Sequence, residues 1–214
     1  MSWFKESAAT IKALFTPAHG FILPAFGHLD PLATPPGAAL LFYGTPGNTL
    51  TERLGTNKYR FPYNPPPFHA ALMMRDGMFH NVGQFKTQRL LSSALSSTRR
   101  IDAVVPKLFA TRPDLVSMLM QNADLDLSVP HFGLETTDYG VADFLHFGFS
   151  FIRHGKDLVC SGDLDKLWGT VGVQAAQEDE YHAAPWDILT NAMSKPEQFD
   201  IWTIHIGKDF APHG

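Results

Sequence analysis

Two apolar arms separated by an Asp-Gly pair constrain the fold of this 214-residue chain more than any other feature. The first arm runs from His69 to Met74, the second from Met78 to Asn81, and Asp76-Gly77 lies between them. Asp-Gly is a preferred pair for the tight turn that joins two antiparallel strands, because both of its residues tolerate positive φ. The pattern therefore predicts a β-hairpin in the middle third of the chain.

The rest of the chain alternates between segments typical of strands and segments typical of helices. Apolar or alternating runs bounded by turn residues predict strands over residues 37–43, 100–105 and 198–206. Helical spacing, capping residues and proline positions predict helices over residues 3–15, 48–54, 87–97, 111–120, 136–151, 160–171 and 185–189. Since there is no internal repeat or linker, we expect one α+β domain over residues 37–214, preceded by a helix and a Pro- and Gly-rich wrap over residues 1–36.

Composition excludes several classes of protein. Apolar residues make up 44% of the chain, which is ample for a packed core. The formal net charge of -4 and the scattered lysines and arginines argue against nucleic-acid binding. A single cysteine permits no internal disulfide. Charged residues interrupt the N-terminal apolar stretch, and no stretch has the length of a membrane span, so we expect a cytoplasmic or particle-associated protein without signal peptide or transmembrane segment.

The single cysteine, Cys160, stands at the start of a predicted helix whose apolar residues include Leu164, Leu167 and Trp168. A thiol in this position feels the positive end of the helix dipole, which favours the nucleophilic thiolate. The alternative is that a lone buried cysteine serves only as a small, inert apolar residue. A catalytic role therefore depends on a base elsewhere in the chain.

Candidate bases are the histidines of the predicted strands. Both arms of the hairpin carry one, His69 well back from the turn and His80 close to it. The two are not direct cross-strand partners, so their proximity is a hypothesis that needs a twist or a bulge in the hairpin. His205, on the predicted last strand, is the main rival base.

Two of these segments resemble one family. Cys160-Ser161-Gly162 resembles the Cys-Ser-Gly motif that opens the catalytic helix of NlpC-type, papain-like cysteine peptidases. The stretch from His69 to His80 resembles their histidine hairpin, in which a histidine starts an apolar strand and a second polar residue ends the next strand. Here the hairpin precedes the cysteine helix, as in the circularly permuted branch that includes peptidoglycan-type amidases and the lecithin retinol acyltransferase group. Segments 37–42 and 185–189 resemble the flanking strand and helix of that branch.

This resemblance implies a papain-like α+β fold, in which a small central antiparallel sheet packs against a cysteine-bearing helix in circularly permuted order. It implies that Cys160 is the nucleophile, His69 the base and His80 the residue that orients His69. No cofactor or metal is implied. The function implied is a cysteine hydrolase that cleaves an amide bond through an acyl-enzyme, most similar to a peptidoglycan-type amidase or endopeptidase acting on a peptide or acyl substrate, such as a cell-wall peptide.

The chain departs from the family pattern at Ala38 and Val159, where aspartate is common, and these departures leave other functions open. One is a noncatalytic structural or binding protein, such as a phage particle component, that retains the papain-like shell. Another is an acyltransferase or thioesterase acting on lipid acyl groups. A third is a zinc site formed by His69, His80 and His182 with acidic residues, although the chain has no His-Glu-x-x-His motif.

Overall fold

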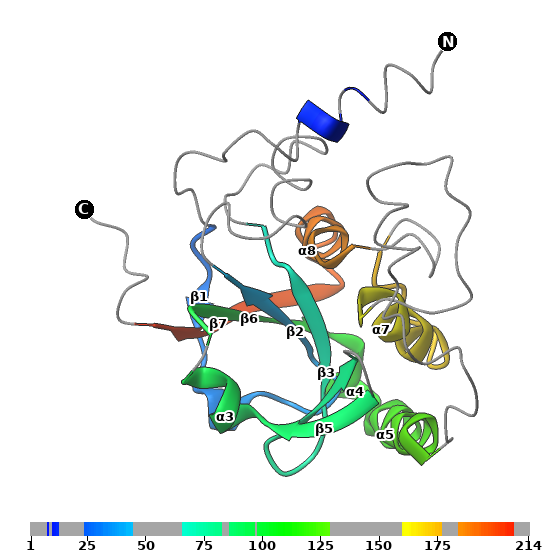
Figure 1. The fold of residues 1–214 in the computed structure, drawn as a ribbon. Helices are drawn as coiled ribbons and strands as arrows, with labels where there is room; N and C mark the ends of the chain where they lie inside the picture. Colours follow the sequence, from blue (N-terminus) through cyan, green and yellow to red (C-terminus); the bar gives the residue numbers. More distant parts are fainter. Residues whose placement is uncertain are drawn as a thin grey trace, which may run out of the picture.

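The fold is described here from a computed structural model, whose described residues are 8, 10–12, 24–44, 66–82, 86–96, 98–128, 160–176 and 184–207. Figure 1 shows a central sheet with helices beside it. Three sequence predictions fall mostly or wholly outside the described residues: the helices over residues 3–15, 48–54 and 136–151.

The described strands form one seven-stranded sheet in the order β1-β7-β6-β2-β3-β4-β5. Its strands are β1 (Gly27–His28), β2 (Ala39–Tyr43), β3 (His69–Met73), β4 (Met78–Val82), β5 (Lys86–Leu90), β6 (Arg100–Pro106) and β7 (Phe199–Ile206). Every neighbouring pair is antiparallel except β1 and β7, which are parallel. The predicted antiparallel sheet is thus mixed and larger than expected, because a short segment of the N-terminal wrap adds a parallel edge strand.

The turn of the predicted hairpin is confirmed. Met78 donates its backbone N–H to Arg75 O across the turn, at 3.1 Å. Both central residues have positive φ, 58° at Asp76 and 70° at Gly77. This is the turn geometry whose twist matches that of two antiparallel strands, and it explains why an Asp-Gly pair stands here.

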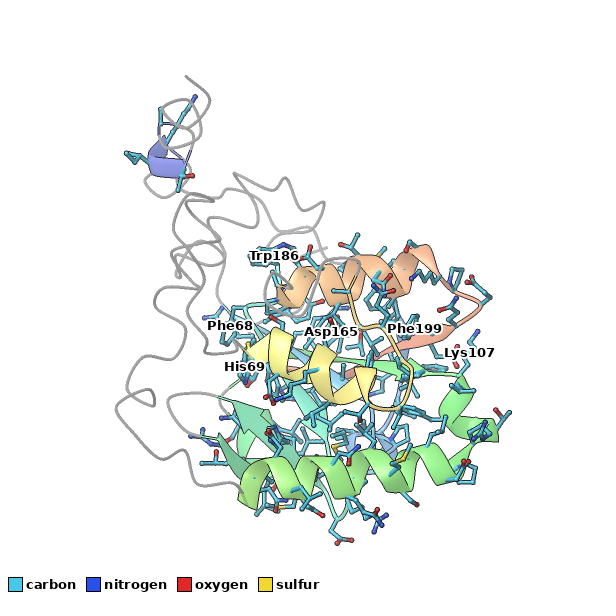
Figure 2. All side chains as sticks on the ribbon, turned by 90° about the vertical axis from the view of Figure 1, so that its right-hand side faces the viewer. Phe68, His69, Lys107, Asp165, Trp186 and Phe199 are labelled. Atoms are coloured by element: carbon cyan, nitrogen blue, oxygen red, sulfur yellow. The ribbon has the colours of Figure 1, made fainter. Side chains whose placement is uncertain are left out.

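Helices cover the sheet unequally. The described helices are η1 (Pro31–Ala33), α3 (Leu91–Leu95), α4 (Leu108–Thr111), α5 (Pro113–Ser128), α7 (Cys160–Gly169) and α8 (Pro185–Ser194). Figure 2 shows α8, α7 and α5 stacked in that order across one face of the sheet, whereas Figure 1 places α3 away from them. No described helix is both long and apolar enough to cross a membrane.

One sequence prediction is wrong in this region. Residues 87–97 were predicted to be helical throughout, but Lys86–Leu90 form strand β5 and only Leu91–Leu95 are helical. Backbone pairing with β4 supplies the hydrogen bonds of the first half of the segment. Tertiary pairing therefore overrides the local preference of a polar segment, as it does commonly for strands.

Trp168 connects the helical layer to the sheet. Its side chain is fully buried, stacks on Phe199 of β7 at 6.0 Å between ring centroids, and meets Phe109 of α4 edge-on. Its indole Nε1–H donates to Gly37 O at 2.9 Å, just before β2. Gly37 has a φ of 91°, and an added Cβ there would lie 2.9 Å from the Phe109 ring. Helix α7 is thus held at a fixed place over the sheet, which matters because it begins at Cys160.

Candidate active site

Cys160 is the first residue of α7. Its side chain is 4% exposed and is not in a disulfide. The first backbone N–H groups of a helix have no partner within the helix, so the start of α7 at Cys160 is a place where a developing negative charge can be stabilised. The predicted helix start at the cysteine is confirmed.

His69 is the first residue of β3 and is partly buried. Its ring lies 5.4 Å from the Phe42 ring and 6.4 Å from the Phe68 ring, measured between centroids. Figure 2 shows His69 and Phe68 at one end of α7, with Trp186 above them on α8. The aromatic rings restrict the orientation of the imidazole.

Cys160 and His69, far apart in sequence, come together at this end of α7. Burial lowers the pKa of His69, but the negative charge of Cys160, a hydrogen bond with its side chain and a further hydrogen bond with Asn81 together outweigh it. The net pKa of His69 is therefore raised above 6.5, even though the positive charge of Arg89 opposes the change. A thiolate beside an imidazolium is the charge arrangement of an activated cysteine.

Asn81 of β4 is the residue that orients His69. Its side-chain Oδ1 lies 2.9 Å from His69 Nε2, so the ring nitrogen donates a hydrogen bond to the amide oxygen. With Nε2–H held by Asn81, the other ring nitrogen, Nδ1, is left for exchange of a proton with Cys160. The three side chains form a Cys-His-Asn arrangement, in which the third member fixes the ring and its tautomer.

The prediction that His80 orients His69 is wrong. His80 Nε2 lies 3.1 Å from Asp126 Oδ2 on α5, and its Nδ1 lies 3.7 Å from Asp163 Oδ2 on α7. Neighbouring residues of a strand point to opposite faces of the sheet, so His80 and Asn81 cannot both face His69. The strand carries the predicted polar partner, but one residue later than expected.

The group around His80 could also hold a metal ion. His80, Asp126 and Asp163 offer ligand atoms that all lie within 4.8 Å of one another. A single ion, however, binds one imidazole nitrogen, whereas these carboxylates approach opposite nitrogens of the ring. The arrangement fits a histidine held between two carboxylates better than a metal centre. The zinc site considered from the sequence also needs His182, which lies outside the described residues.

The rival base, His205, is engaged elsewhere. Its Nε2 lies 3.0 Å from Thr98 O, on the β7 side of the sheet. Sequence reasoning missed Asn81, although strand alternation offered a signal. Along the strand that follows the turn, residues 79 and 81 point to one face of the hairpin and His80 points to the other.

Comparisons with known protein families, curated proteins and solved structures found no match for this chain.

Proposed function

We propose that this protein is a cysteine hydrolase that cleaves an amide bond through an acyl-enzyme formed on Cys160. The observation that carries the proposal is the position of His69, which interacts with Cys160 on one side and with Asn81 on the other. An inert core cysteine needs no such neighbour, since a buried thiol packs as an apolar group.

The mechanism follows from the three side chains. The Cys160 thiolate attacks the carbonyl carbon, and the resulting oxyanion accepts hydrogen bonds from backbone N–H groups at the start of α7. The C–N bond then breaks as His69 gives its proton to the departing amine, which leaves a thioester on Cys160. A water molecule, deprotonated by His69, attacks the thioester and releases the acid and the free thiol.

The proposed fold is papain-like in circularly permuted order. It is supported by the hairpin that carries His69 and Asn81, which precedes the cysteine helix in the chain and packs against it through β3. A peptidoglycan-type peptide is the substrate that the family resemblance favours. Lipid esters and thioesters also offer a carbonyl carbon to a thiolate, so they are the alternative substrates to test.

One observation favours a second candidate function. Cys160 is only 4% exposed, which is the exposure expected if the chain keeps the papain-like shell as a noncatalytic structural or binding protein. The two candidates differ in whether a small electrophile reaches a reactive thiolate.

Alkylation of Cys160 by iodoacetamide near neutral pH tests the proposal directly. We expect the folded protein to react faster than the urea-unfolded chain, because His69 favours the thiolate only in the folded state. Slower reaction in the folded protein supports the noncatalytic candidate.

Turnover is then measured on a panel of muropeptides, lipid esters and thioesters. Cys160→Ala and His69→Ala should each abolish hydrolysis of the accepted substrate while circular dichroism shows a retained fold. The matched control is His205→Ala, a partly buried strand histidine that should keep activity. Hydrolysis that survives Cys160→Ala would contradict the mechanism.

A further inference from the structure

His80 and Asn81 are consecutive residues of β4 that serve opposite faces of the sheet. Asn81 binds His69, the proposed base. His80, whose side chain is 2% exposed, lies against Asp126 of α5 and Asp163 of α7. One dipeptide therefore contacts both the base and the helix that carries the proposed nucleophile.

Asp163, which lies against His80, affects how readily the Cys160 thiol ionises. It lies in the first turn of α7, three residues after Cys160, and is 1% exposed. Residues three apart on a helix are neighbours, with Cβ atoms about 5–6 Å apart. A buried carboxylate so close to a thiol opposes formation of the thiolate, because two negative charges repel strongly where water is excluded.

The His80 ring is placed to offset that charge. Its Nδ1 lies 3.7 Å from Asp163 Oδ2, an ion-pair distance when the ring is protonated. Asp126 holds the opposite ring nitrogen at 3.1 Å, which fixes the ring against α7. On the neighbouring strands His80 pairs with Leu72 of β3 and Gln88 of β5, neither of which is charged.

We propose that His80 acts on Cys160 through Asp163: its protonated ring, held on the other side by Asp126, offsets the carboxylate charge beside the thiol. This inference rests on the proposed function, in which Cys160 reacts as a thiolate. It assigns the two residues of the dipeptide complementary tasks, Asn81 for the base and His80 for the nucleophile.

The test is the iodoacetamide reaction of Cys160, which needs no substrate. We expect His80→Gln to slow alkylation by about tenfold, because the variant removes one positive charge beside a carboxylate that lies one helical turn from the thiol. The double variant His80→Gln/Asp163→Asn should recover to within about threefold of the natural protein, since it also removes the charge. A purely structural role for His80 predicts no recovery. His205→Gln, which alters a partly buried histidine on β7, is the matched control and should react at the natural rate.

Several results would overturn the inference. An unchanged rate in His80→Gln, or a loss that the double variant does not recover, would do so. If His80→Gln does not fold, Asp163→Asn alone decides: it should react at the natural rate or faster, and a slower reaction contradicts the proposal. One equivalent of bound metal that is lost in His80→Gln would also contradict it.

The inference and the proposed function fail in different ways. Slow alkylation of the natural protein removes the proposed thiolate and both claims with it. Fast alkylation of the natural protein together with an unaffected His80→Gln removes only the role of His80.

Discussion

At the scale of single residues, the site depends on which neighbour holds the ring of His69. A hydrogen bond from a ring nitrogen to a fixed oxygen orients the imidazole and sets its tautomer. Asn81 supplies that oxygen at 2.9 Å. The Asn81 amide is uncharged, so it fixes the ring without adding negative charge near Cys160.

Replacing Asn81 tests this role. We expect Asn81→Ala to lower kcat/KM by about 10- to 100-fold, since a hydrogen bond to a charged group contributes about 1.5–3 kcal/mol. Steady-state kinetics on the accepted substrate measure the loss. Gln88→Ala is the control, because Gln88 is an exposed amide on the adjacent strand that bonds Asp124 instead. Equal losses in the two variants would show that Asn81 has no special role.

The raised pKa of His69 predicts a pH dependence with a definite sign. The imidazolium form persists above pH 6.5 in the folded protein and is lost as the pH rises through the raised pKa. The contribution of this imidazolium to stability is therefore present in full below pH 6.5, the pKa of the unfolded chain, and is lost as the pH rises through the raised pKa of the folded protein. Proton transfer to the leaving amine should fail over the same range, so the activity should fall on the alkaline side.

A direct titration of the His69 ring by NMR checks the cause. In Cys160→Ala the pKa of His69 should be lower than in the natural protein, because the charge and the hydrogen bond of Cys160 are both lost while burial remains. An unchanged or higher value would mean that Cys160 does not carry negative charge beside the ring.

At the scale of elements, α7 is the structure that connects the core to the site. Its first residue is Cys160, and near its other end Trp168 is fully buried between Phe109 and Phe199. The indole hydrogen bond to Gly37 O fixes the helix along its own axis as well as across the sheet. Packing at one end of the helix thereby determines where the thiol lies at the other.

Truncating Trp168 should therefore reduce stability and reactivity together. We expect Trp168→Phe to cost about 2–4 kcal/mol, the sum of a small cavity and an unsatisfied buried carbonyl. Urea unfolding measures the change in free energy, and iodoacetamide measures the thiol. Trp202→Phe, at a partly buried tryptophan of β7, is the control and should cost less. A cost for Trp168→Phe no larger than that of the control would contradict the role of this contact.

At the scale of the whole molecule, a buried ion pair on β6 joins the N-terminal segment to strands β6 and β7 of the sheet. Arg100 of β6 donates to Asp102 Oδ1 at 2.8 Å, to Thr203 Oγ1 of β7 at 3.0 Å and to Pro24 O at 2.8 Å. Its guanidinium also lies over the ring of Tyr43, 5.4 Å from the centroid. Burial raises the pKa of Asp102, and Arg100 opposes that change.

Removing one member of this pair should be worse than removing both. We expect Arg100→Met to destabilise the fold by about 3–5 kcal/mol, because it leaves the Asp102 carboxylate buried without its cation. The double variant Arg100→Met/Asp102→Leu should recover much of that loss. Thermal and urea unfolding measure both variants, and additive losses would contradict the pairing.

Much of the fold was predictable from local signals. The Asp-Gly turn, the apolar strands and the helix that begins at Cys160 each follow from residues adjacent in the chain, whose steric and hydrogen-bonding preferences act locally. The pairing of Lys86–Leu90 with β4 was not predictable, since it depends on a partner strand and not on the segment itself. The parallel β1 edge has the same origin.

The candidate site, like the fold, was predictable only in part. The sequence by itself determined the chemistry available: one thiol at a helix start and a histidine at the head of an apolar strand. Only the tertiary structure decided that His69 meets Cys160 and that Asn81, not His80, holds the ring. The reason is that adjacent residues of a strand point to opposite faces of the sheet, so a shift of one position along β4 exchanges the residue that faces His69. Which face of the sheet each residue occupies is decided only when the helices pack against it.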